Sequence, residues 1–200
     1  MIARGTGYVR GNRKAAGKRL AAHFKYLEYR SPGEMESRAS RSIFNKQEDR
    51  VSRKEAVDDV MSHTSSAVNF HKLMLSPGRD EPIDDWKEWT RDVMHDLEQH
   101  VGKDLHWYAV EHHNTDHPHV HIVVAGAGEN HSTGKTEPVK LYSHDYHFLR
   151  ESGRDHSGYD FYRELDQINR DLDTQDREEH AKALDLRQYD QFHERGDVDR

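Results

Sequence analysis

Hydrophobic residues recur along the chain at two spacings, and each spacing predicts a different kind of element. Spacings of three and four residues predict two amphipathic helices, one in "NRKAAGKRLAAHFKYLEYR" (residues 12–30) and one in "PIDDWKEWTRDVMHDLEQHVG" (82–102). The second helix has acidic residues in its first turn and a glycine after its last, as many helices do. A third helix is predicted in "SRKEAVDDVMSH" (52–63), where Ser52 and Glu55 have the spacing of a capping box.

Alternating hydrophobic residues predict strands in three other segments. "AVNFHKLMLSPG" (67–78) alternates and ends in a Pro-Gly turn signal. "LHWYAVEHH" (105–113) and "HVHIVVAG" (119–126) are separated by a short connection rich in turn-forming residues, which predicts an antiparallel hairpin. The chain becomes helical again from residue 143. Because strands and helices do not strictly alternate, we expect an α+β fold, with helices packed on one face of an antiparallel β-sheet and a helical C-terminal extension.

Composition narrows the class of protein. Hydrophobic residues make up 33% and charged residues 34% of the 200 residues, which predicts one modest core with polar extensions. We expect one domain over residues 1–150 and an acidic helical extension over 151–200. The absence of cysteine excludes disulfides and thiolate metal sites and agrees with a reducing cytoplasm. No window is long and apolar enough to span a membrane, so we expect a cytoplasmic protein without membrane insertion.

Charge is unevenly distributed along the chain, although the formal net charge is −7. The first 30 residues carry many arginines and lysines against Glu28 alone, whereas acidic residues gather near the C-terminus. Such a basic N-terminal arm suits a protein that binds phosphates at one end. A solvated helix face is the alternative, and charge alone favours that alternative. If the arm binds DNA, the expected phosphate contacts are Arg10, Arg13, Lys14, Lys18 and Arg19.

Histidines crowd the predicted hairpin, in the segment "EHHNTDHPHVHIVVAG" (111–126). Residues two apart on a strand face the same way, so His119 and His121 should project side by side. The partner strand can add either His112 or His113 to that face, but not both, because they point in opposite directions. Three imidazoles without a thiolate suit a divalent Mn, Zn, Co, Ni or Fe ion and leave positions open for water or substrate. A polar sheet face with adventitious metal binding is the alternative.

The same segment resembles the histidine motif of the HUH endonucleases, specifically the conjugative relaxases and the related T-DNA border nuclease. The resemblance implies that His112, His119 and His121 are the metal ligands. It also implies supporting roles for residues around them: Asp116 as a catalytic acidic group, and His117 and Glu111 as groups that orient the ligands or assist proton transfer. Asn114 departs from the family pattern, which often has aspartate there, so no general base is expected at that position.

Two further motifs extend the resemblance over roughly residues 14–128. Relaxases carry a nucleophilic tyrosine at the end of an N-terminal helix, and "HFKYLEYRSPGE" aligns Tyr26 with it, with Tyr29 as runner-up. Tyr8 is a third candidate, in a stretch rich in glycine and arginine. An aromatic residue of the helix core is the alternative interpretation of Tyr26. The family's strand end of the form Leu-Ser-Pro-Gly is matched at residues 75–78.

The resemblance implies a strand-specific DNA nickase at the transfer origin of a plasmid or other mobile element. The tyrosine would attack a phosphodiester and form a 5′-phosphotyrosine intermediate. The expected cofactor is a divalent metal ion, Mn or Mg first and Zn, Co or Ni as alternatives. The expected partners are single-stranded DNA at the origin and accessory relaxosome proteins. A rolling-circle replication initiator, or a histidine-metal phosphodiesterase or metal-binding module without covalent catalysis, remains the alternative.

Overall fold

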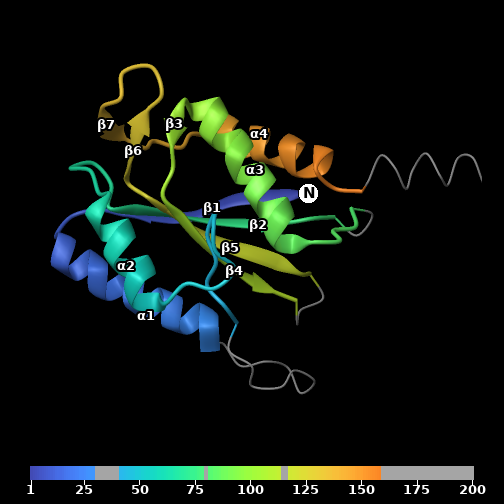
Figure 1. The fold of residues 1–200 in the computed structure, drawn as a ribbon, viewed down its shortest axis with the longest axis horizontal. Coiled ribbons are helices and arrows are strands. Elements are labelled where there is room, and N and C mark those ends of the chain that lie inside the picture. The colour runs from blue at the N-terminus through green and yellow to red at the C-terminus, as the bar shows by residue number, and fades with distance from the viewer. Residues whose placement is uncertain (30–40, 79–80, 114–116, 159–200) are drawn as a thin grey trace, which may run out of the picture. The chain divides into compact units, whose positions relative to one another are not determined.

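A four-stranded antiparallel sheet with the strand order β1-β2-β5-β4 lies at the centre of the fold (Figure 1). The computed structural model describes residues 1–29, 41–78, 81–113 and 117–158. The four strands are β1 (Ile2–Val9), β2 (Phe70–Ser76), β4 (Trp107–His112) and β5 (His119–Ala125). The helices of the described part are α1 (Arg13–Tyr29), α2 (Arg53–Ser62), α3 (Trp86–Val101) and α4 (Ser143–Asp155). This arrangement confirms the predicted α+β class.

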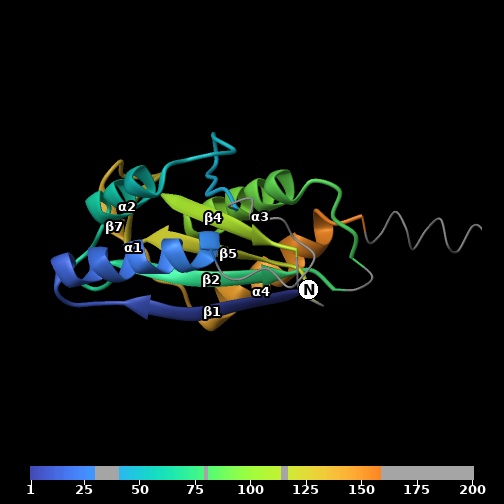
Figure 2. The same ribbon diagram turned by 90° about the horizontal axis from the view of Figure 1, so that it is seen from below.

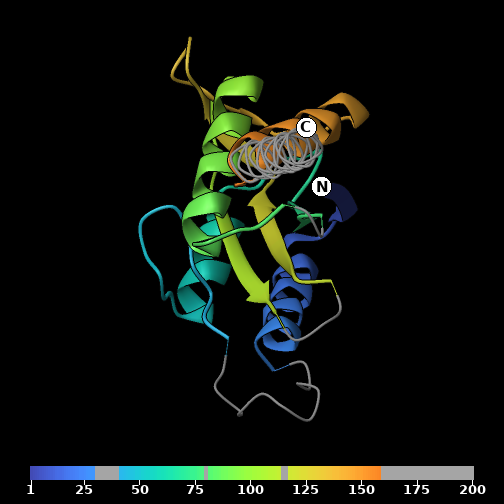
Figure 3. The same cartoon turned by 90° about the vertical axis from the view of Figure 1, so that its right-hand side faces the viewer.

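Helices cover both faces of the sheet, which corrects the prediction that they pack on one face. Figure 2 shows α1 running along the sheet, and Figure 3 shows α1 and α2 on one side of it with α3 and α4 on the other. The inner strands are buried on both sides: Val123 of β5 packs in the core with α1, while Ile122 and Val124 pack in the core with α3. A strand covered on both faces shows a near-continuous apolar run, as residues 122–125 of β5 do, whereas alternation is typical of a strand with one covered face.

The predicted hairpin is present as β4 and β5. Its antiparallel register pairs His112 with His119 and Val110 with His121. Strand β2 lies on the other side of β5 and pairs Met74 with His121. His121 therefore lies on an inner strand with a neighbouring strand on each side, whereas His112 lies on the edge strand β4.

The helix ends also agree with the sequence signals. The Ser52 hydroxyl accepts a hydrogen bond of 3.2 Å from the Glu55 backbone N–H and caps α2. Asp85 accepts hydrogen bonds from two backbone N–H groups at the start of α3. Gly102 ends α3 in the left-handed conformation, with φ of 65°, which glycine adopts without steric cost.

The basic N-terminal arm is in fact an edge strand followed by the first helix. Residues Ile2–Val9 pair with β2, and the register shifts between Gly5 and Gly7, where Gly7 has φ of 139°. Ala3 is the residue of β1 that belongs to the hydrophobic core. Such a strand lacks the alternating apolar residues that would have predicted it, because its outer edge and most of its side chains face solvent.

A second, three-stranded sheet of order β3-β6-β7 was also not predicted. Its strands are β3 (Lys103–Asp104), β6 (Ala127–Asn130) and β7 (Thr136–Pro138). The glycines of this region permit close backbone contacts: a Cβ on Gly126 would lie 1.9 Å from the Val68 carbonyl oxygen, and one on Gly128 2.2 Å from that of Asp104. From the sequence, these glycines indicate a loop. In the structure, they allow the strands to pass close to the backbone of other segments.

The described residues up to Gly158 form one compact unit. The expected domain boundary at residue 150 falls inside α4, which continues to Asp155. The helical extension expected beyond it falls mostly on residues 159–200, which lie outside the described residues, so that extension stays a prediction. No helix in the described part of the chain is both long enough and apolar enough to cross a membrane.

Candidate active site

Three histidines of the hairpin converge on the sheet face that carries α1, and we call His112, His119 and His121 the strand cluster. The Nε2 atoms of His119 and His121 lie 3.2 Å apart. The ring centroid of His112 lies 5.2 Å from that of His119 and 4.9 Å from that of His121. One potential ligand atom from each ring lies within 4.8 Å of the others. The geometry also selects His112 over its neighbour His113.

Hydrogen bonds hold two of these rings in defined tautomers. His119 Nδ1 donates to the His117 carbonyl oxygen at 2.9 Å, so Nε2 of the neutral ring carries the lone pair. His112 Nε2 donates to the Leu27 carbonyl oxygen at 3.1 Å, which leaves Nδ1 with the lone pair. His112 and His119 are buried, at 1% and 9% exposure. Buried imidazoles whose other ring nitrogens are bonded to protein oxygens are suitable donors for a divalent cation.

The last turn of α1 is attached directly to the strand cluster. Leu27, whose carbonyl accepts from His112, immediately follows Tyr26. One turn earlier, the His23 ring lies edge-on to His121 with centroids 6.5 Å apart. Tyr26 is therefore flanked on both sides by residues that contact the cluster, and its side chain is 53% exposed. Helix packing explains the attachment: Leu20, Phe24 and Leu27 are fully buried against the sheet.

Tyr29, the runner-up nucleophile, is oriented by different neighbours. Its ring lies 5.7 Å from the guanidinium carbon of Arg53, at the start of α2. Arg53 also forms an ion pair of 2.7 Å with Glu28. These contacts associate Tyr29 with α2, whereas the contacts beside Tyr26 are with the histidines.

Two groups near the strand cluster were missed from the sequence. Burial and the positive charge of Lys72 lower the pKa of His23 from 6.5 to about 4, so this imidazole is neutral at pH 7. Lys72 comes from β2, which lies next to β5. Neither residue belongs to a recognisable motif. His23 could have been suspected only from its position one turn before Tyr26 in a helix.

The other predicted site residues are placed as follows. Glu111 does not join the strand cluster: its carboxylate accepts a hydrogen bond of 2.8 Å from His113. His113 in turn packs edge-on against Trp86 of α3, on the opposite face of the sheet. Adjacent strand residues point to opposite faces, which explains why Glu111 and His112 separate. His117 contacts His119 through its backbone carbonyl, and Asp116 lies outside the described residues.

The predicted phosphate contacts lie toward the other end of α1. Arg13 begins the helix and Tyr26 is thirteen residues further on, about 20 Å at 1.5 Å per residue. The Arg10 guanidinium packs on the Tyr8 ring and donates to its hydroxyl, and Arg13 donates to the Met61 carbonyl oxygen. Like these two arginines, Lys14, Lys18 and Arg19 have exposed side chains. The structure does not bring these residues to the strand cluster.

The third sequence motif is connected to the histidine motif in space. Ser76 ends β2, and its hydroxyl donates to the Pro118 carbonyl oxygen at 2.8 Å. Pro118 directly precedes β5, so this bond fixes the backbone at the entry to His119. The Leu-Ser-Pro-Gly segment therefore supports the strand cluster from the neighbouring strand.

Comparison with known protein families agrees with this geometry. The structure defines a class of protein, namely an α+β domain. In it, three convergent histidines of the sheet lie next to a helix turn that bears a tyrosine. The family model for relaxases, described as the MobA/VirD2-like nuclease domain, matches residues 26–148. The chain therefore belongs to this relaxase family and is a DNA-nicking enzyme. A comparison with curated proteins found no match.

Proposed function

We propose that this protein nicks one DNA strand by transesterification, with Tyr26 as the nucleophile. The Tyr26 oxygen bonds to phosphorus, the bond from phosphorus to the 3′ oxygen breaks, and that oxygen leaves as a 3′-hydroxyl after taking a proton. The product is a 5′-phosphotyrosine that a 3′-hydroxyl can later attack in reverse. The observation that carries this proposal is the 3.1 Å hydrogen bond from His112 to the Leu27 carbonyl, which attaches the turn bearing Tyr26 to the strand cluster.

The strand cluster fits a divalent cation by its chemistry as well as its spacing. Two Nε2 atoms 3.2 Å apart are close to the separation of about 3.4 Å expected for two ligands of one tetrahedral ion. When bound, such an ion polarises a phosphate oxygen and neutralises developing charge. The all-nitrogen donor set favours Mn²⁺ over Mg²⁺, because Mg²⁺ prefers oxygen ligands. Zn, Co and Ni suit the same donors.

The chain's own residues would position the substrate and remove the phenolic proton. Tyr26 is exposed, and its helix packs on the sheet face that the histidines share, so its hydroxyl would attack a phosphate held beside them. Of the two acidic groups expected to assist, Glu111 is turned to the other face, which leaves Asp116 as the proposed proton acceptor. That role of Asp116 rests on its match to the family motif alone.

The proposed substrate is single-stranded DNA at an origin of transfer, delivered in the cytoplasm with the help of accessory relaxosome proteins. Unpaired bases stack on exposed aromatic rings, and phosphates are held by cationic side chains. Along α1, the predicted contacts lie between about 10 Å (Arg19) and about 20 Å (Arg13) from Tyr26 at 1.5 Å per residue, and Arg10 precedes the helix. They would therefore hold nucleotides away from the scissile phosphate, and their loss should weaken DNA binding more than it slows the chemistry.

Covalent capture on a denaturing gel tests this proposal. The full chain is incubated with Mn²⁺ and labelled single strands that tile the transfer origin of its own replicon. We expect a covalent adduct with the wild-type chain and with Tyr29→Phe, and none with Tyr26→Phe. An adduct that survives in Tyr26→Phe moves the nucleophile to another tyrosine. Metal-dependent free ends without any adduct would replace transesterification by hydrolysis, and an adduct only on replication-origin strands would favour a rolling-circle initiator.

A further inference from the structure

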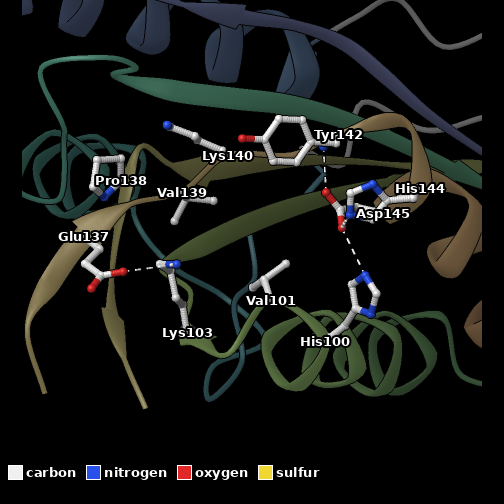
Figure 4. Close-up of a pocket in the computed structure, with 10 residues that line it drawn as sticks. All are labelled: His100, Val101, Lys103, Glu137, Pro138, Val139, Lys140, Tyr142, His144 and Asp145. Atoms are coloured by element: carbon white, nitrogen blue, oxygen red, sulfur yellow. Dashed lines mark hydrogen bonds and ion pairs between the residues drawn. The ribbon is translucent and has the colours of Figure 1, made fainter. Parts of the chain in front are cut away.

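A second group of side chains of the kinds that ligate metals lies outside the active site, where the end of α3 meets the start of α4. Figure 4 shows His100 from α3 and His144 and Asp145 from α4 at one end of a cavity of about 460 Å³. We call these three residues the helix-end cluster. All three line the cavity, which is bordered on its far side by Lys103 and Glu137. The relaxase chemistry proposed above uses none of these residues.

A nitrogen of each imidazole lies close to the same carboxylate oxygen, and that of His100 is hydrogen-bonded to it. His100 Nε2 lies 3.0 Å from Asp145 Oδ1, and His144 Nε2 lies 3.2 Å from that oxygen. One potential ligand atom from each residue lies within 4.8 Å of the others. Two ligands of a tetrahedral zinc ion are about 3.4 Å apart, given bonds of 2.0–2.1 Å. The two nitrogen-to-oxygen distances are therefore within a few tenths of an ångström of those that one shared ion requires.

Neighbouring groups hold each member of the helix-end cluster in place. The His100 ring stacks on Phe148, with centroids 4.1 Å apart and planes at 10°. The His144 ring is nearly parallel to Tyr142, at 5.6 Å and 13°. The second oxygen of Asp145 accepts a 2.6 Å hydrogen bond from the Tyr142 backbone N–H, and the side chain is 4% exposed. Asp145 is thus oriented by α4 itself, with its other oxygen directed toward the imidazoles.

We propose that the helix-end cluster binds a zinc-class divalent cation, with His100, His144 and Asp145 as ligands. Two imidazole nitrogens and one carboxylate oxygen form a donor set that Zn²⁺, Co²⁺ and Ni²⁺ accept and that Mg²⁺ and Ca²⁺ disfavour. Three protein ligands leave a fourth position, which the adjoining cavity opens to water. Since the ligands come from α3 and α4, the bound ion joins the end of one helix to the start of the other.

A third group, Asp59, His63 and His106, is a weaker candidate for the same chemistry. Its two imidazole rings stack face to face, with centroids 3.4 Å apart and planes at 11°. Lone pairs of stacked rings run side by side and do not converge on one point. The Asp59 carboxylate oxygen nearest to His106 also accepts a 3.0 Å hydrogen bond from the Tyr108 hydroxyl. This group serves as the internal comparison for the zinc experiment.

The test is zinc binding by the full chain in a background that lacks the strand cluster. His119→Ala with His121→Ala removes two ligands of the active site, and Zn²⁺ is then titrated against a chromogenic chelator. We expect the background chain to bind one Zn²⁺, and added His144→Ala to weaken that binding at least about tenfold, since loss of even an orienting group costs that much. The matched control is His147→Ala, on the same helix and similarly exposed, at 64% against 69% for His144. This control should bind Zn²⁺ as the background does.

Cobalt supplies a second readout that a change in folding would not imitate. Co²⁺ in the background chain should give the visible spectrum of a four-coordinate ion, and His144→Ala should abolish it while the melting temperature in chelator stays unchanged. Zn²⁺ binding that His144→Ala leaves intact, or that only His63→Ala removes, would overturn the proposal. So would a background chain that binds no Zn²⁺. None of these results depends on nicking activity, so the proposed function stands or falls separately.

Discussion

The strand cluster and the helix-end cluster contain similar side chains but are assembled in different ways. In the strand cluster, His119 and His121 are two residues apart, and a hairpin register brings His112 opposite His119. In the helix-end cluster, His100 is 44 residues before His144, and only the packing of α3 against α4 brings them together. The first cluster therefore depends on local backbone geometry and the second on tertiary contacts.

The two clusters also differ in what lies beside them. The strand cluster contacts the helix turn that bears an exposed tyrosine, and its imidazoles are mostly buried. The helix-end cluster also has an exposed tyrosine beside it, Tyr142, but that residue stacks on His144 and donates its backbone N–H to Asp145, and the histidines of this cluster are more exposed. On the two proposals above, similar ligands would serve chemistry in one place and helix attachment in the other. The neighbours of a metal-binding group, more than its donors, indicate its role.

The largest expected effect is on the nicking rate, and it should differ between variants of the two clusters. His121→Ala should lower the nicking rate about 10³-fold, because charge stabilisation by a bound metal ion is worth several kcal/mol. His144→Ala should leave the rate within about twofold, because surface changes away from a site cost little. Single-turnover nicking of a labelled origin strand in Mn²⁺ measures both rates. Equal losses in the two variants would show that the clusters are not functionally distinct.

Stability should distinguish the helices that support each cluster. Phe24 is fully buried and packs edge-on against Tyr108, with centroids 6.5 Å apart, so Phe24→Ala should lower the free energy of unfolding by about 3–5 kcal/mol. Phe148 is only partly buried and stacks on His100, so Phe148→Ala should cost about 1 kcal/mol. Urea unfolding followed by circular dichroism gives both values. A cost for Phe148→Ala as large as that for Phe24→Ala would contradict the difference in packing.

The smallest expected effect concerns His71, which belongs to neither cluster. Burial lowers the pKa of its imidazole below 6.5, and its Nε2 donates to the Val139 carbonyl oxygen at 2.9 Å. The unfolded chain therefore binds more protons at this residue than the folded chain. The free energy of unfolding should fall as the pH is lowered from 6.5 to the pKa of His71 in the folded chain. Over this range the free energy of unfolding should change more steeply with pH in the wild type than in His71→Gln. The difference between the two slopes should be at most about 1.4 kcal/mol per pH unit. Unfolding measured from pH 7 to pH 4 tests this, and identical slopes would contradict it.

Local patterns in the sequence predicted the elements that position the strand cluster. Alternation predicted β4 and β5, and the capping residues of α2 and α3 were evident from Ser52 and Gly102. The sequence did not predict β1, because an exposed edge strand interrupted by Gly7 shows no periodic burial. It also could not assign helices to opposite faces of the sheet, since each helix shows one apolar side whichever face it covers.

The candidate site was predictable only where residues lie close in sequence. The hairpin pattern left His112 and His113 as alternatives, and the structure separates them by the face to which each points. Glu111 was expected to assist the metal ligands or proton transfer, but its side chain lies on the opposite face of β4. His23 and the helix-end cluster depend on how helices dock on the sheet or on each other, which no short sequence pattern encodes.

The most direct test of the central claim is to identify the residue that carries DNA in the covalent adduct. The adduct formed with an origin strand is digested with nuclease and trypsin, which leaves a nucleotide on the peptide of residues 26–30. This peptide contains both Tyr26 and Tyr29, so fragment ions in mass spectrometry must distinguish them. We predict that the nucleotide is attached to Tyr26. Attachment to Tyr29, to Tyr8 or to any other residue would contradict the account.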